Sequence, residues 1–232
     1  MDKSKTDIWV YAHWAGIRDA KCIGILSAHF GKGRKSFSFE YDSDWISSHE
    51  QLLLDPDLGW YSGQQFPNEK ENFGIFLDSM PDSWGRTLLQ RREPTRAREE
   101  GREPRKLHDI DFLLGVYDAS RMGALRYKTD PEGPFLEIES SITTTPWTTL
   151  NELQEAVRVI ESDEDDEHIR KWILMLIAPG SSLGGARPKV NFTDSSKNLW
   201  IAKFTSKNDK IDKAGWEFLA YRLALKAGII MS

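Results

Sequence analysis

Three runs of β-favouring residues lie near the start of the chain, at 8–11, 22–26 and 36–41. The third run alternates aromatic residues with polar ones, which is the pattern of a strand with one buried face. Turn-forming residues separate the runs at Ala15-Gly16 and Gly31-Lys32-Gly33. The pattern therefore predicts an antiparallel, β-rich N-terminal part.

Helical spacing replaces this alternation further along. The Asp42-Ser43-Asp44 segment is typical of an N-cap and predicts a short helix after it. Apolar residues at helical spacing then run from Phe73 to Leu89, and Pro81 interrupts them. Because proline breaks a helix interior, we expect a short helix, a break, and a second helix from Asp82.

Residues 90–106 contain almost no apolar side chains, and prolines and a glycine interrupt them. We expect a solvated connector or a helix lying on the surface, and we place the boundary between two domains here, 1–106 and 107–232. The segment is locally basic and could contact nucleic acid. Its interleaved glutamates favour a charged, exposed linker instead.

The rest of the chain mixes both kinds of element, which makes the expected fold class α+β. Helices are expected over 108–117, where Asp109 is the predicted N-cap, and over 148–160 and 170–178, with a strand over 123–127.

Residues 179–228 carry the most informative pattern. A loop of small residues at 180–189 precedes strands at 190–192 and 199–204 and a helix over 211–227. The inner face of that helix is expected to carry Trp216, Leu219, Ala220, Leu223 and Ala224.

Composition and charge exclude several classes. Of 232 residues, 31 are Lys or Arg and 36 are Asp or Glu, giving a formal charge of −5. A non-specific nucleic-acid coat needs surplus cations, so the whole chain is not expected to act as one. The single cysteine, Cys22, excludes an internal disulfide and a cysteine-cluster zinc site, and we expect an inert core thiol. The histidines have no metal-ligand spacing, so no metal site is predicted.

Membrane association is not expected either. The chain begins without the apolar stretch of a signal peptide. Its longest apolar run, Trp172–Ala178, is too short to span a bilayer. The expected compartment is the cytoplasm.

The loop, the strand lysine and the helix glutamate in series suit a nucleotide polyphosphate. Gly, Ser and Ala let backbone N–H groups approach phosphate oxygens closely. Lys203 on the second strand can reach the α- and β-phosphates, and Glu217 on the next helix can hold that lysine in place. Taken singly, Lys203 is also an ordinary solvent-facing lysine and Glu217 an ordinary exposed carboxylate. Their order behind the glycine loop is the specific feature.

Ser182-Leu183-Gly184-Gly185-Ala186-Arg187-Pro188-Lys189, followed by Trp200–Phe204 and Trp216–Ala220, resembles the HipA family of serine/threonine-kinase toxins. Two earlier segments agree with it. Phe76–Arg86 resembles the family's "LLPDGWGR" segment, and 111–127 resembles its helix–strand unit that ends in "GALR(F/Y)". The likeness runs over nearly the whole chain and covers about the first half of a typical member.

The resemblance implies a protein-kinase-like N-lobe after the β-rich part, with ATP as cofactor. The implied ATP-binding residues are Gly184, Gly185, Ala186, Lys189, Lys203 and Glu217. Among these, Lys203 would contact the α- and β-phosphates and Glu217 would position it, whereas Lys189 ends the loop without a more specific role.

Ser182 matches the loop serine that the family autophosphorylates, and Ser181 is adjacent to it. A phosphate there would add nearly two negative charges where the ATP phosphates bind and would oppose nucleotide binding. The alternative is that Ser182 is an ordinary turn hydroxyl with no regulatory role.

Phosphoryl transfer also needs a catalytic-loop Asp, an Asn and a Mg²⁺-binding Asp. In the family these lie in a helical C-terminal lobe, further along than residue 232, so no catalytic residue is predicted in this chain and Mg²⁺ is expected only with that lobe. His108-Asp109-Ile110-Asp111 is superficially similar to the HxD or DxD arrangement of a catalytic loop. It precedes the glycine loop, however, whereas a kinase has its catalytic loop after it.

Three functions remain open. The first is the N-terminal portion of a HipA-like kinase toxin. Its implied partner is a HipB-type helix-turn-helix antitoxin, and its implied protein substrate is a translation component such as an aminoacyl-tRNA synthetase. Nucleic acid would be reached only through the antitoxin. The second is a non-catalytic homologue that neutralises a HipA-type kinase or its antitoxin, with Trp9, Trp14, Trp45, Trp60 and Trp84 as possible anchors. The third is a small α+β protein that binds another phosphate compound.

Overall fold

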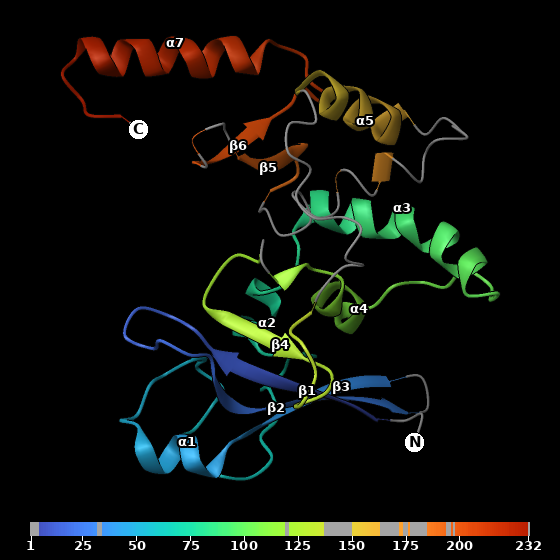
Figure 1. The fold of residues 1–232 in the computed structure, drawn as a ribbon, viewed down its shortest axis with the longest axis vertical. Coiled ribbons are helices and arrows are strands. Elements are labelled where there is room, and N and C mark those ends of the chain that lie inside the picture. The colour runs from blue at the N-terminus through green and yellow to red at the C-terminus, as the bar shows by residue number, and fades with distance from the viewer. Residues whose placement is uncertain are drawn as a thin grey trace. The chain divides into compact units, whose positions relative to one another are not determined.

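The computed structural model describes residues 5–31, 34–118, 121–136, 150–162, 172–173, 176, 185–193, 196 and 198–231. The chain forms two compact units: Met1–Pro81 with Arg105–Ser141, and Asp82–Pro104 with Ile142–Ser232 (Figure 1). The second unit thus draws on two separate stretches of the chain. The division into domains at 1–106 and 107–232 stays a prediction.

A four-stranded antiparallel sheet organises the first unit. Its strands are β1 (Lys5–Ala12), β2 (Lys21–Gly31), β3 (Arg34–Tyr41) and β4 (Leu125–Lys128), in the order β3-β2-β1-β4. All three pairs are antiparallel. The α+β class and the β-rich N-terminal part are therefore confirmed.

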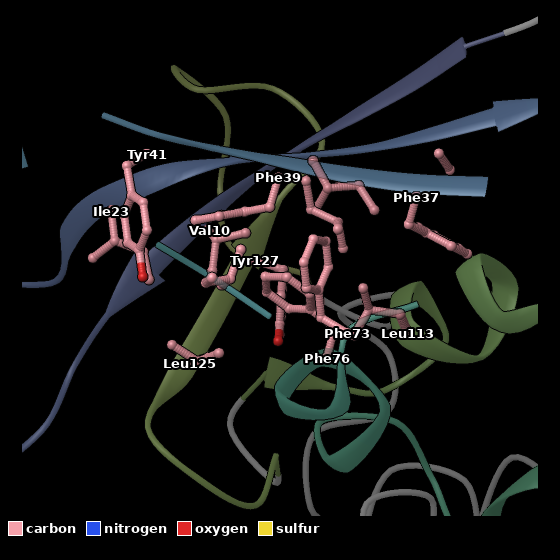
Figure 2. Packing of buried hydrophobic residues seen from close by; sticks show 14 of the residues in the cluster. Val10, Ile23, Phe37, Phe39, Tyr41, Phe73, Phe76, Leu113, Leu125 and Tyr127 are labelled. Atoms are coloured by element: carbon pink, nitrogen blue, oxygen red, sulfur yellow. The ribbon is translucent and has the colours of Figure 1, made fainter. Parts of the chain in front are cut away.

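One face of this sheet forms the core of the unit. The predicted burial of Phe37, Phe39 and Tyr41 is confirmed, and Ser38 on the opposite face is buried as well. Three short helices belong to the same unit: α1 (Ser43–Ser48), α2 (Gly74–Asp78) and α4 (Asp109–Leu114). Figure 2 shows Phe76 of α2 and Leu113 of α4 beside the aromatic side chains of the sheet.

Two tyrosines of this core have raised pKa values. Burial raises the pKa of Tyr127 to about 12, and burial together with the Asp55 carboxylate raises that of Tyr41 to about 12. An unfolded tyrosine ionises near pH 10. Because the folded-state pKa is the higher one, this contribution to stability is complete below about pH 10 and is lost as the pH rises through 12.

We therefore expect Tyr127→Phe to move alkaline unfolding to higher pH, because phenylalanine cannot ionise. A shift from about 10 to about 12 corresponds to roughly 3 kcal/mol for one group. Circular dichroism against pH, with phenolate absorbance recorded in parallel, measures the midpoint. Tyr61→Phe is the control, because Tyr61 is exposed. Equal midpoints for the two variants would contradict the prediction.

Two helices begin at the predicted caps. Asp82 caps α3 (Ser83–Glu99) by accepting from the Ser83 N–H. Asp42 caps α1 by accepting from the amides of Asp44 and Trp45. The prediction of Asp109 as an N-cap is wrong by one position. His108 has the extended backbone of a cap and Asp109 is the first helical residue, because the Asp111 carboxylate accepts from the His108 N–H.

Residues 90–99 continue α3, so the surface-helix alternative is confirmed for them and the connector alternative is wrong. The helix passes through Pro94 and buries Ala97 and Glu93. Arg102 folds back onto the Glu93 carboxylate, with its two guanidinium nitrogens at 2.5 and 3.2 Å. This bidentate ion pair compensates the negative charge of the Glu93 carboxylate, which can therefore be buried.

The second unit contains α3, α5 (Leu150–Ser162), the hairpin β5 (Lys189–Thr193) with β6 (Leu199–Lys203), and α7 (Lys213–Lys226). Helix α5 buries its apolar face as expected, through Leu153, Ala156, Val157 and Ile160. The helix expected over 170–178 falls mostly outside the described residues.

The expectation of a buried inner face on α7 is wrong for the described structure. None of its residues is buried, and Trp216, Leu219 and Leu223 are each about half exposed or more. Its charged residues Glu217 and Arg222 lie on nearly opposite sides of the helix, and the described elements of its unit do not cover the apolar residues between them. Within the described residues, no helix has the length and apolar character needed to cross a membrane.

Candidate anion-binding site

The β5–β6 hairpin brings two lysines together. Its register places Lys189 directly opposite Lys203. Opposite residues of an antiparallel pair project from the same face of the sheet, so both ammonium groups lie on one side of the hairpin. Burial, and then the positive charge of Lys203, lower the pKa of Lys189. Two neighbouring ammonium groups repel each other and favour an anion between them.

The predicted pairing of strand lysine and helix glutamate is present. Lys203 Nζ donates to Glu217 Oε2 at 3.1 Å, which joins β6 to α7. The Asp212 carboxylate starts α7 in the required place by accepting from the Gly215 N–H at 2.9 Å. Both members of the ion pair are more than half exposed, so the pair contributes little to stability.

The glycine loop is described from Gly185 onward, and Gly184, Ser181 and Ser182 lie outside the described residues. Gly185 has a φ of +90°, in the left-handed region that favours glycine. A Cβ at this position would lie 2.6 Å from Lys189 Nζ. The lysine ammonium therefore lies directly against the loop backbone, and any side chain at position 185 would displace it. Ala186 follows and is exposed.

The first turn of α3 holds this loop. Asp82 Oδ2 accepts from the Gly185 N–H at 2.6 Å, and the Trp84 N–H donates to the Gly185 carbonyl at 3.2 Å. The Trp84 indole Nε1 donates to the Lys189 carbonyl at 3.0 Å. The amides of Gly185 and Ser83 lower the pKa of Asp82. Sequence analysis missed this contact, and its only signal was the helix start after Pro81.

Arg187 fixes the other side of the loop and was also missed. Its guanidinium donates to the Phe204 carbonyl at 3.3 Å and to Asp209 Oδ2 at 2.6 Å. Asp209 in turn accepts from the Ser206 N–H at 3.0 Å and pairs with Lys213, the first residue of α7. The hydrogen bond from the Ser206 N–H is the main reason that the pKa of Asp209 is lowered. The loop and the start of α7 are thus linked through one guanidinium.

Four of the predicted ATP-binding residues are joined through these contacts: Gly185, Lys189, Lys203 and Glu217. The arrangement offers two cations and a glycine backbone, which suit the binding of a polyanion. No group of three His, Cys, Asp or Glu side chains among the described residues could hold a metal ion. Burial raises the pKa of the Cys22 thiol, and the side chain is partly exposed rather than in the core as expected.

Comparisons with models of protein families, with curated protein sequences and with solved structures found no match.

Proposed function

We propose that the second unit binds the phosphate chain of ATP as the N-lobe of a HipA-like serine/threonine kinase. The observation that carries the proposal is the Lys203–Glu217 ion pair, at 3.1 Å between a strand and the helix that follows it. Protein kinases use a lysine and a glutamate in these positions to orient the α- and β-phosphates. Lys189, opposite Lys203, adds a second cation on the same face.

The proposed activity of the whole protein is ATP-dependent phosphorylation of serine or threonine in a cytoplasmic toxin–antitoxin system. Catalysis and Mg²⁺ would require a C-terminal lobe with the catalytic Asp, the Asn and the Mg²⁺-binding Asp. A HipB-type antitoxin is the proposed partner, and a translation component such as an aminoacyl-tRNA synthetase the proposed substrate. Autophosphorylation at Ser182, or at the adjacent Ser181, would weaken ATP binding by repulsion.

The second candidate is a non-catalytic interaction module, and the exposed apolar side chains of α7 favour it. Trp216, Phe218 and Leu223 are each exposed by more than half. Trp216 and Leu223 project from one side of the helix and Phe218 from the other, and large exposed apolar side chains of this kind mark interaction surfaces. The tryptophans first considered as anchors are less suitable, since Trp45 and Trp84 are buried and Trp9, Trp14 and Trp60 are partly buried.

Lys203→Ala is expected to weaken ATP binding roughly tenfold or more, because it removes a hydrogen bond between charged groups. Titration calorimetry with the full chain measures the dissociation constant. Lys70→Ala is the matched control: Lys70 is also half exposed and also pairs with a carboxylate, that of Asp57 at 3.5 Å, but it lies in the first unit. Equal losses in the two variants, or no ATP binding by the unaltered chain, would overturn the proposal.

A further inference from the structure

The Asp82 carboxylate lies where the proposed phosphate ligand would have to bind. Its Oδ2 is 2.6 Å from the Gly185 nitrogen, the loop amide that belongs to the predicted phosphate-binding set. An amide has one hydrogen to donate, so the same N–H cannot serve a phosphate oxygen while Asp82 accepts from it.

The groups around this carboxylate are ones that attract an anion. It caps a helix of 17 residues, whose N-terminus carries a partial positive charge. The Lys189 ammonium lies against the same loop backbone and acts on Asp82 through its charge. One anion therefore already satisfies groups that are expected to attract phosphate.

We propose that Asp82 is an internal competitor of the phosphate ligand, which can engage the Gly185 amide only after the carboxylate has moved away. This inference rests on the proposed function. Asp82 would thus lower the affinity of the site for phosphate, because its negative charge repels the ligand and because it occupies the Gly185 amide.

The loop has other supports that would hold it once the carboxylate moves. The Trp84 N–H keeps the Gly185 carbonyl, and the Trp84 indole keeps the Lys189 carbonyl. Asp82 itself is exposed, so its carboxylate can turn into water without a desolvation cost. Its departure therefore frees the amide without dismantling the loop.

The test uses inorganic triphosphate as the probe and the full chain as the protein. Asp82→Asn and Asp82→Ser both keep a good N-cap and remove the charge. We expect each to bind triphosphate about tenfold more tightly, because a charge-assisted hydrogen bond no longer competes. Asp42→Asn is the control, since it makes the same change at the N-cap of α1 in the first unit. It should leave the affinity unchanged.

Thermal unfolding of each variant checks that the fold is retained. If both Asp82 variants are folded and bind triphosphate no better than the unaltered chain, or less well, Asp82 orders the loop and the inference is wrong. In that case a loss of binding in Lys203→Ala would still support the proposed function. If neither the unaltered chain nor any variant binds triphosphate, both proposals are overturned.

Discussion

Replacing Trp84 by alanine is expected to destabilise the second unit by about 3–5 kcal/mol, the usual cost of removing a buried aromatic side chain. Trp84 is 3% exposed, and its indole also donates to the Lys189 carbonyl at the start of β5. The substitution therefore leaves a cavity and removes a link between α3 and the hairpin. Because that link holds the glycine loop, ATP binding should weaken in the same variant.

Denaturant unfolding measures the stability loss, and two variants separate its causes. Trp84→Phe keeps most of the buried ring but removes the indole N–H, so it should cost about 1–2 kcal/mol through the lost hydrogen bond. Trp216→Ala removes the same side chain from an exposed position on α7, where it is 62% exposed. A loss in Trp216→Ala as large as that in Trp84→Ala would show that burial is not the cause.

Phe39→Ala is expected to have a similar effect on the first unit, again about 3–5 kcal/mol. The Phe39 side chain is 0% exposed, and its ring lies 5.0 Å from that of Tyr41 and 5.3 Å from that of Phe76 (Figure 2). Removing it takes away the centre of an aromatic cluster that joins the sheet to α2. The surrounding rings cannot close the space without leaving their own contacts.

Phe66→Ala is the matched control for this second prediction. Phe66 has the same side chain but is 56% exposed, so its removal should change the free energy of unfolding by about 0.5 kcal/mol or less. Chemical denaturation followed by circular dichroism compares the two variants. Similar values for both would mean that the cluster around Phe39 does not carry the stability of the unit.

Local patterns predicted the elements well where neighbours along the chain decide the conformation. Alternation of apolar and polar residues predicted β3, and the break at Pro81 with a cap at Asp82 predicted α3. The α3 segment also shows where local reasoning fails. Its charged second half has no apolar face, and only the approach of Arg102 explains why Glu93 is buried.

For the candidate site, the order of glycine loop, strand lysine and helix glutamate along the chain was enough to pair Lys203 with Glu217, because each residue type suits its element. The sequence by itself also predicted strands β1, β2 and β3, since period-two alternation and turn residues act over a few positions, but the pairing of β4 with β1 was not predicted. Only the tertiary structure decided that Asp82 meets Gly185, a partner 103 positions away, and that α7 stays exposed. Such contacts depend on how whole elements pack, and no pattern within a few residues of the chain specifies that packing.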